Sequence, residues 1–259
     1  MAQDVWTLST LNVNGLRSGV RRGFGPWLRR RRPDVLCLQE LRLTPEHEPA
    51  GELGPPQRWR GEWNHADKRG YSGVAVWSRE KALEVRKGSG LGWSDLEGRV
   101  ITTDFPSVRV ASVYVPSGAR GARQGRKDAF LEHFLEFTRK LLTDGRPTVF
   151  CGDLNIAHTE LDIHNASANK KSSGFLPHER AWMDALLAQG WVDVYRKVHP
   201  EGRHYSWWSN LGRARELDRG WRLDYQIATP DLADRAVAAK IERKAGLSDH
   251  APVTITYRR

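Results

Sequence analysis

Short apolar runs rich in β-branched residues recur along the chain, and polar or turn-forming residues separate them. Runs of this kind predict β-strands that are buried on at least one face. The expected strands cover residues 5–11, 35–38, 74–77, 100–103, 108–115, 148–151, 225–228 and 253–257.

Helical periodicity is clearest over residues 127–143, where apolar side chains recur at helical spacing and charged side chains fill the opposite face. A second helix is expected over residues 178–189, because Pro177 stands at its start and Gly190 follows its end. A weaker pattern predicts a third helix over residues 24–32. This helix ends in a run of arginines, which we expect to be a solvated last turn that complements the helix dipole.

The alternation of strands with helices favours a single α/β domain over residues 1–259. The chain contains no internal repeat, low-complexity tract or obvious linker. The turn-rich segment 44–70 is expected to form surface structure.

The basic residues outnumber the acidic ones. Lysine and arginine total 41 against 31 aspartates and glutamates, which gives a formal net charge of +10. Such an excess attracts polyanions, with nucleic acid first and anionic lipid second. Charge alone also fits simple solubility, so the class of partner has to come from the chemistry of the site.

The cytosol is the compartment that the sequence favours. Cys37 and Cys151 each lie inside an apolar run and are expected to be small core residues, without the spacing of a metal site. The amino terminus lacks the pattern of a signal peptide, and no run of apolar residues is long enough to span a membrane.

Polar residues gather where the apolar runs end. In open α/β folds, ligand sites form beyond strand ends, on loops that the sheet holds rigidly. Side chains two residues apart on a strand point the same way, so Asp153 and Asn155 are expected to share one face. The polar residues found at strand ends are Asn12, Asn14, Glu40, Tyr114, Asp153, Asn155, Asp224, Ser248, Asp249 and His250.

These residues suit a divalent metal centre if the strand ends converge. Carboxylates that face one another repel, so the cluster needs a cation, and oxygen ligands without a thiolate suit magnesium or manganese. Each feature alone has a simpler explanation, because Asp-x-Asn often forms a turn and Ser-Asp-His can cap a helix. The prediction rests on their joint occurrence.

Seven segments together resemble the exonuclease III family of abasic-site DNA endonucleases, within the endonuclease/exonuclease/phosphatase superfamily. They occur in order along essentially the whole chain. The segments are LNVNGLR (11–17), PDVLCLQE (33–40), YVPSGARG (114–121), CGDLNIAH (151–158), NKKSSGFLPHER (169–180), GWRLDY (220–225) and LSDHAPV (247–253).

The resemblance implies a four-layer α/β sandwich, with two packed mixed β-sheets flanked by helices. It also implies magnesium-dependent hydrolysis of the phosphodiester 5′ to an abasic site, with manganese as a substitute ion. The expected product carries a 3′ hydroxyl, and 3′ to 5′ exonuclease activity and removal of 3′ blocking groups are expected as well.

The resemblance also assigns roles to single residues. Asp153 matches the carboxylate that activates or positions the attacking water, and Asn155 should orient that water or a phosphate oxygen. Tyr114 should lie near the phosphate or the leaving oxygen. His250 should touch the scissile phosphate, while Asp224 should hydrogen-bond it, fix its tautomer and favour its positive charge.

Metal binding is assigned in the same way. Glu40 matches the principal metal ligand, with Asn12 close by, and Asp249 matches the acidic partner of the terminal pair. Asn14 stands where some relatives carry an aspartate, which removes one possible ligand. Ser117 stands where many relatives carry an asparagine and could make a shorter phosphate contact.

The expected partner is double-stranded DNA with abasic sites or blocked 3′ ends. Trp207 and Trp221 match the walls of a pocket for the extruded, baseless sugar. Contacts with the DNA backbone would not read sequence, which suits lesions at any position. The residues expected to grip the backbone or line the site are Arg120, Asn165, Asn169, Lys170 and Lys171, with Arg123, Arg126 and Lys127 extending the basic loop.

Two alternative functions stay open at this point. A lipid or phosphoinositide phosphodiesterase of the same superfamily would share the metal and water residues but would not need the two tryptophans. A non-catalytic DNA-binding protein on the same scaffold would have lost at least one catalytic group. We expect a monomer in the bacterial cytosol or nucleoid, and no membrane partner.

Overall fold

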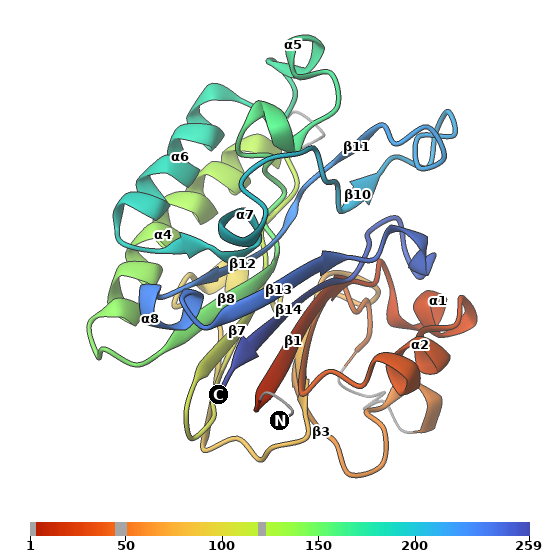
Figure 1. The fold of residues 1–259 in the computed structure, drawn as a ribbon, viewed down its shortest axis with the longest axis vertical. Helices are drawn as coiled ribbons and strands as arrows, with labels where there is room; N and C mark the ends of the chain where they lie inside the picture. Colours follow the sequence, from red (N-terminus) through yellow and green to blue (C-terminus); the bar gives the residue numbers. More distant parts are fainter. Residues whose placement is uncertain (1–3, 45–50, 119–122) are drawn as a thin grey trace.

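Two six-stranded mixed sheets pack face to face in the computed structural model, which describes residues 4–44, 51–118 and 123–259 (Figure 1). The first sheet, in spatial order, is β13 (Ala236–Ile241), β14 (Val253–Arg258), β1 (Val5–Asn12), β2 (Val35–Gln39), β4 (Val74–Ser78) and β3 (Arg60–Asn64). The second is β5 (Glu84–Lys87), β6 (Val100–Asp104), β7 (Arg109–Tyr114), β8 (Thr148–Asp153), β12 (Asp224–Ala228) and β9 (Val192–Asp193).

Helices cover the outer face of each sheet (Figure 1). The pair α1 (Leu16–Arg21) and α2 (Phe24–Arg31) packs on the first sheet, and the longer pair α4 (Gln124–Leu142) and α6 (Pro177–Ala188) packs on the second. This arrangement confirms the expected four-layer α/β sandwich. The remaining elements are α3 (Gly92–Asp95), α5 (Ala166–Asn169), α7 (Val194–Val198), α8 (Pro230–Ala233), the ribbon of β10 (Trp207–Trp208) with β11 (Gly220–Trp221), and the 3₁₀ turns Gly51–Leu53, Glu160–Asp162 and Arg243–Ala245.

The space between the sheets holds one shared hydrophobic core. Cys37 and Cys151, from the first and second sheets, are both buried in it as free thiols, as expected. Polar bridges cross the same core, because Gln39 Nε2 donates to Ser112 Oγ at 2.9 Å and Gln226 Nε2 donates to the Leu8 carbonyl at 2.9 Å. These bridges fix one sheet relative to the other, so the strand ends above them are held rigidly. Within the described residues, no helix combines the length and apolar character that crossing a bilayer requires.

The eight expected strands are present, with ends that differ by two residues or fewer. The expectation for segment 44–70 needs correction, because Arg60–Asn64 forms the edge strand β3. Its sequence, RGEWN, has no β-branched residue, and it is mostly half-exposed because it pairs only with β4. The other edge strand of this sheet, β13, was missed for a similar reason. Its alanine-rich sequence carries no strand pattern, and its side chains are partly exposed.

A glycine controls how β8 ends. Gly152 has a φ of 144°, and a Cβ atom added there would lie 2.0 Å from the carbonyl oxygen of Val113 on β7. Only a residue without a side chain can therefore sit between Cys151 and Asp153 while the two strands stay paired. A glycine directly before Asp153 is therefore sterically required for Asp153 to lie at the end of β8.

The Gly152→Ala variant should lower the free energy of unfolding by about 2–5 kcal/mol, because its Cβ collides with backbone rather than with a movable side chain. Urea denaturation measures this change. Gly125→Ala is the matched control, since its Cβ would meet nothing within 4 Å on the exposed start of α4. Equal stability of the two variants would contradict the steric explanation.

Candidate active site

The register of the strands brings the predicted polar residues together. Asp153 at the end of β8 pairs across the sheet with Asp224 on β12 and, on its other side, with Tyr114 at the end of β7. From the opposite sheet, Asn12 ends β1. Its Nδ2 donates to Glu40 Oε1 at 2.9 Å and to Asp153 Oδ2 at 2.9 Å. Carboxylates of both sheets therefore meet at one buried amide.

Glu40 stands at the open side of this meeting point. It follows β2 with a left-handed φ of 50°, and its side chain keeps 15% of its surface exposed. Arg42 Nη2 donates to Glu40 Oε2 at 2.7 Å and offsets part of its charge. Burial, followed by the charge of Glu40, raises the pKa of the Tyr114 hydroxyl well above its usual value, so that hydroxyl stays protonated.

Asp153 is almost completely buried. Burial raises its pKa to about 7, and Asp224 adds to this rise, whereas the charge of His250 opposes it. The backbone N–H of Asn155 donates to Asp153 Oδ1 at 2.9 Å, and Asn155 Nδ2 donates to Asp153 Oδ2 at 3.2 Å. The two side chains meet as expected, but strand alternation is not the reason. Asn155 has a left-handed φ of 53°, so a turn beyond β8 closes the contact.

His250 is held between two carboxylates. Its Nδ1 lies 2.8 Å from Asp224 Oδ2, and its Nε2 lies 3.7 Å from Asp153 Oδ2. Burial alone would lower the pKa of His250, but Asp224 and then Asp153 raise it to about 10. The imidazole is therefore positively charged at neutral pH, and Nδ1–H donates to Asp224.

Sequence reasoning missed one member of this arrangement. The hydroxyl of Ser206, which is fully buried, donates to Asp224 Oδ2 at 2.6 Å and accepts the backbone N–H groups of Leu223 and Asp224 at 3.0 Å each. It fixes the carboxylate that orients His250. A serine after Tyr205 carries no local pattern, so its role depends on contacts that only the fold creates.

Asp249 faces a neighbouring set of donors. Its Oδ1 accepts from Asn14 Nδ2 and Ser248 Oγ, each at 2.9 Å, and its Oδ2 accepts from Trp207 Nε1 at 3.2 Å. Burial would raise its pKa, but His250 and these donors lower it. Asp249 is therefore ionised, and it joins the polar site to the tryptophan.

The donor set fits a divalent cation. Among the described residues, Asp153, Asp224 and His250 offer ligand atoms within 4.8 Å of one another. A cation held by all three would require His250, which is positively charged at neutral pH, to release a ring proton. The Glu40 and Asp153 carboxylates instead offer oxygen ligands, which hard divalent ions prefer. The Asn12 amide turns its Nδ2 toward both carboxylates, and its Oδ1 accepts the Asn14 N–H.

A cavity of about 570 Å³ opens beside these residues. Asn155 lines it next to Trp207 and Trp221, whose rings meet edge to face with centroids 6.2 Å apart. Lys171 and Gly174 line the same cavity. Both tryptophans are half-buried cavity walls, so neither is a simple core residue.

The other expected DNA contacts lie around α5. Asn169 Nδ2 donates to the Asn165 carbonyl at 2.9 Å, so this amide shapes its own loop. Lys170 and Lys171 are exposed. Arg120 lies outside the described residues.

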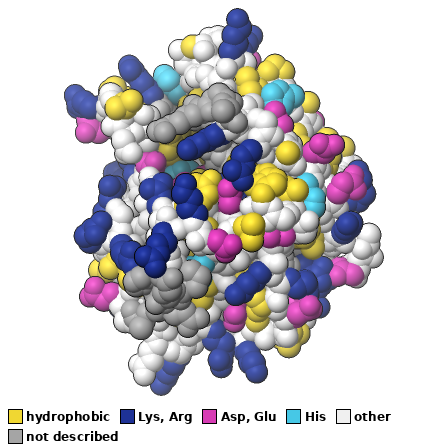
Figure 2. Space-filling model, turned by 180° about the vertical axis from the view of Figure 1, so that it is seen from behind, with side chains coloured by type: hydrophobic (Ala, Val, Ile, Leu, Met, Phe, Trp, Pro, Cys, Tyr) yellow, Lys and Arg dark blue, Asp and Glu magenta, His cyan; other side chains and the backbone are white. Residues whose placement is uncertain are grey.

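The expected extension of the basic loop is wrong for Lys127. It lies on the inner face of the first turn of α4, where its side chain is completely buried and paired with Glu179. Arg126 pairs with Glu97 at 2.7 Å and lies over the ring of Trp93. Figure 2 shows basic and acidic side chains interspersed on the face seen from behind, so the net charge is spread out there.

Comparison with known proteins identifies the family of the chain. The model of the Endonuclease/Exonuclease/phosphatase family matches residues 9–250. The exodeoxyribonuclease of Bacillus subtilis (strain 168) is 38% identical over 257 residues, which cover 96% of this chain and 98% of that protein.

Solved structures give the same result. The 3′-5′ exonuclease (NExo) from Neisseria meningitidis superposes with a TM-score of 0.91 at 30% identity, covering 98% of this chain and 100% of that one. An AP endonuclease from Archaeoglobus fulgidus gives a TM-score of 0.87 at 29% identity, covering 97% of this chain and 99% of that one. The chain therefore belongs to the Endonuclease/Exonuclease/phosphatase family.

Proposed function

We propose that the chain is a metal-dependent DNA repair nuclease that hydrolyses the phosphodiester 5′ to an abasic site and leaves a 3′ hydroxyl. Trimming of blocked 3′ ends and 3′ to 5′ exonuclease activity accompany it. One observation carries the proposal. The cavity walled by Trp207 and Trp221 opens directly beside Asn155, which contacts Asp153. A baseless sugar can enter between the rings while its 5′ phosphate rests on the hydrolytic residues.

The chemistry follows from the charges of the site. Asp153, with its pKa near neutrality, accepts the proton of the attacking water, and Asn155 orients that water. His250, kept positive by Asp224, stabilises the charge that grows on the phosphoryl oxygens. Tyr114, which stays protonated, is proposed to lie near the leaving oxygen.

Magnesium is the proposed cofactor, with manganese as a substitute. Glu40 would hold it, with Asn12 beside it and Asp249 as a further acidic ligand of the site. When bound, the ion supplies Lewis-acid stabilisation of the developing negative charge. The partly exposed Glu40 carboxylate at the open side of the cluster supports this assignment.

Double-stranded DNA is the proposed partner. Lys170 and Lys171 project from the exposed loop beside the cavity, where they can contact phosphates, and Asn165, Asn169 and Arg120 are proposed to act with them. We further propose that residues 1–259 form one domain that acts as a monomer in the bacterial cytosol.

The two alternatives have less support. The similar proteins are named as an exodeoxyribonuclease, a 3′-5′ exonuclease and an AP endonuclease, and none of these names is that of a lipid hydrolase. A non-catalytic protein would not need Glu40, Asp153 and His250 in one connected cluster.

Incision of an end-labelled duplex with one abasic analogue tests the proposal directly. The protein should nick this duplex at the lesion when magnesium is present, and EDTA should abolish the nick. Asp153→Asn should still bind the duplex but lose activity on the order of a thousandfold, because no carboxylate remains to take the proton of the water. If the protein only digests both duplexes from their ends and leaves the abasic analogue uncut, abasic-site incision is contradicted.

Glu40→Ala should raise the magnesium concentration needed for half-maximal incision about tenfold or more, since the main anionic ligand is lost. A titration of rate against magnesium measures this change. Glu132→Ala is the control, because it removes an exposed carboxylate from α4 but no expected ligand. A metal requirement unchanged from the parent protein would place the ion elsewhere.

Gly174→Ala should reduce abasic incision more than removal of a 3′ phosphate. Its Cβ would lie 3.0 Å from the ring of Trp221 and 3.1 Å from the Asn155 carbonyl, which narrows the cavity. A 3′ phosphate has no sugar beyond it and does not fill that cavity. Equal losses on the two substrates, measured as kcat/KM, would refute this role of the cavity.

A further inference from the structure

A fully buried ion pair lies behind the active site. Lys127 Nζ and Glu179 Oε1 are 2.6 Å apart, and neither side chain has any exposed surface. Removing two charges from water is expensive, and well-packed apolar side chains would often be as stable. A pair of this kind therefore calls for a role that an apolar contact cannot fill.

The lysine reaches a residue of the active site. Lys127 Nζ donates a second hydrogen bond to the carbonyl oxygen of Asn155 at 2.8 Å. Asn155 holds a left-handed backbone conformation beyond the end of β8 and contacts Asp153 through its amide. The bond from Lys127 fixes the carbonyl side of this turn, and so the direction in which the Asn155 amide points.

The glutamate holds the wall of the cavity. Glu179 Oε2 accepts the backbone N–H groups of Gly174 at 2.6 Å and Leu176 at 3.0 Å, and both residues line the cavity. Glu179 Oε1 also accepts from Gln124 Nε2 at 3.1 Å. One carboxylate thus binds both the cavity wall and the start of α4 through hydrogen bonds.

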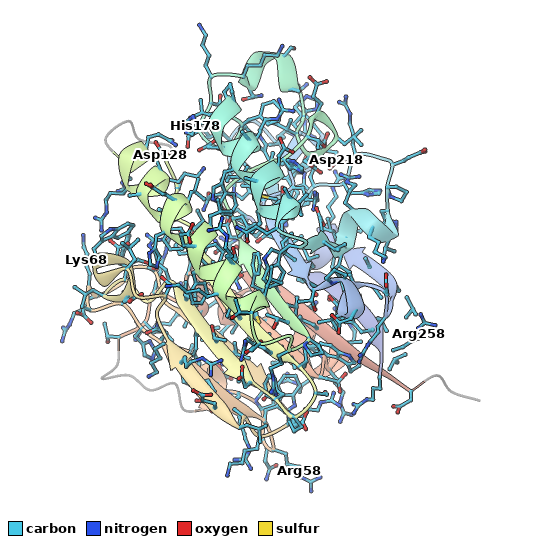
Figure 3. The ribbon with its side chains drawn as sticks, turned by 90° about the vertical axis from the view of Figure 1, so that its left-hand side faces the viewer. Arg58, Lys68, Asp128, His178, Asp218 and Arg258 are labelled. Carbon is cyan, nitrogen blue, oxygen red and sulfur yellow. The ribbon has the colours of Figure 1, made fainter. Side chains whose placement is uncertain are left out.

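The pair joins two helices at the same end. Lys127 and Glu179 lie in the first turns of α4 and α6, which run side by side in Figure 3. The labelled residues Asp128 and His178 mark these turns, and His178 Nε2 lies 3.1 Å from Asp128 Oδ1. The buried pair sits beneath this outer contact and points toward the site.

We propose that Lys127 and Glu179 are positioning residues that lock Asn155 to the cavity wall, so that the extruded sugar and the attacking water are held in one geometry. This inference rests on the proposed function. Neither residue touches substrate. Their directional hydrogen bonds to backbone groups explain why charge is retained where apolar packing would otherwise suffice.

The double variant Lys127→Met with Glu179→Leu tests the inference. It fills the space of the pair with apolar atoms and leaves no unpaired buried charge, so the fold should survive. The kcat for both abasic incision and 3′-phosphate removal should fall about 10- to 100-fold, because Asn155 serves both reactions and loses its support. Affinity for undamaged duplex should change by less than about twofold.

Two further variants complete the design. The isosteric Glu179→Gln keeps the shape of the side chain but turns one acceptor into a donor, so its kcat should also fall. The control is Arg109→Met with Asp104→Leu, which removes a nearly buried ion pair from the far ends of β6 and β7. This control should keep the kcat of the parent protein.

The outcomes separate the inference from the proposed function. Parental kcat in either folded variant of the pair would overturn the positioning role while leaving the nuclease function intact. If the parent protein fails to incise, the nuclease function falls, and amide exchange still reports on positioning. Faster exchange at the Asn155 N–H, which donates to Asp153 Oδ1, with parental exchange in β7, supports the inference. Unchanged exchange at Asn155 overturns it.

Discussion

The site depends on one buried contact, in which the Asn12 amide donates to Glu40 and to Asp153. These carboxylates belong to opposite sheets, and like charges do not approach without a reason. The contact exists because the hydrogen bonds between the sheets and the shared core fix the position of one sheet relative to the other. A small slip of one sheet would separate the anionic residues, and a metal ion would find no common set of oxygens.

The ionisable side chains of the site have different pKa values because their surroundings differ. Asp153 is buried beside another carboxylate, and its pKa rises to about 7. Asp249, with hydrogen bonds from three side chains, has a lowered pKa. His250 stays charged between two carboxylates. A proton acceptor, a fixed anion and a fixed cation therefore coexist within one strand-end cluster, as phosphodiester hydrolysis requires.

The sequence predicts the ends of the strands better than the way they meet. Apolar runs that stop at Glu40 and Asp153 are visible in the chain, because burial ends where the polar side chains begin. The pairing of Asp153 with Asp224 is not visible, since register depends on the partner strand. The left-handed turn at Asn155 is also not visible in the sequence. It sets the direction of the Asn155 side chain, which the alternation of side chains along a strand would otherwise set.

Long-range partners are equally hidden in the sequence. Lys127 resembles one more residue of a basic loop until the fold places it on the inner face of α4, against Glu179 from a segment about 50 positions away. Ser206 has no local pattern at all, yet it holds the carboxylate that orients His250. Edge strand β3 lacks β-branched residues, so only its pairing with β4 reveals it.

We expect the strand ends of both sheets to surround one divalent ion. Anomalous diffraction from crystals soaked in manganese tests it most directly. A manganese peak should appear within coordination distance of the Glu40 carboxylate, with Asp153 and His250 beside it. A peak away from Glu40, or Glu40 far from both of those residues, would contradict it.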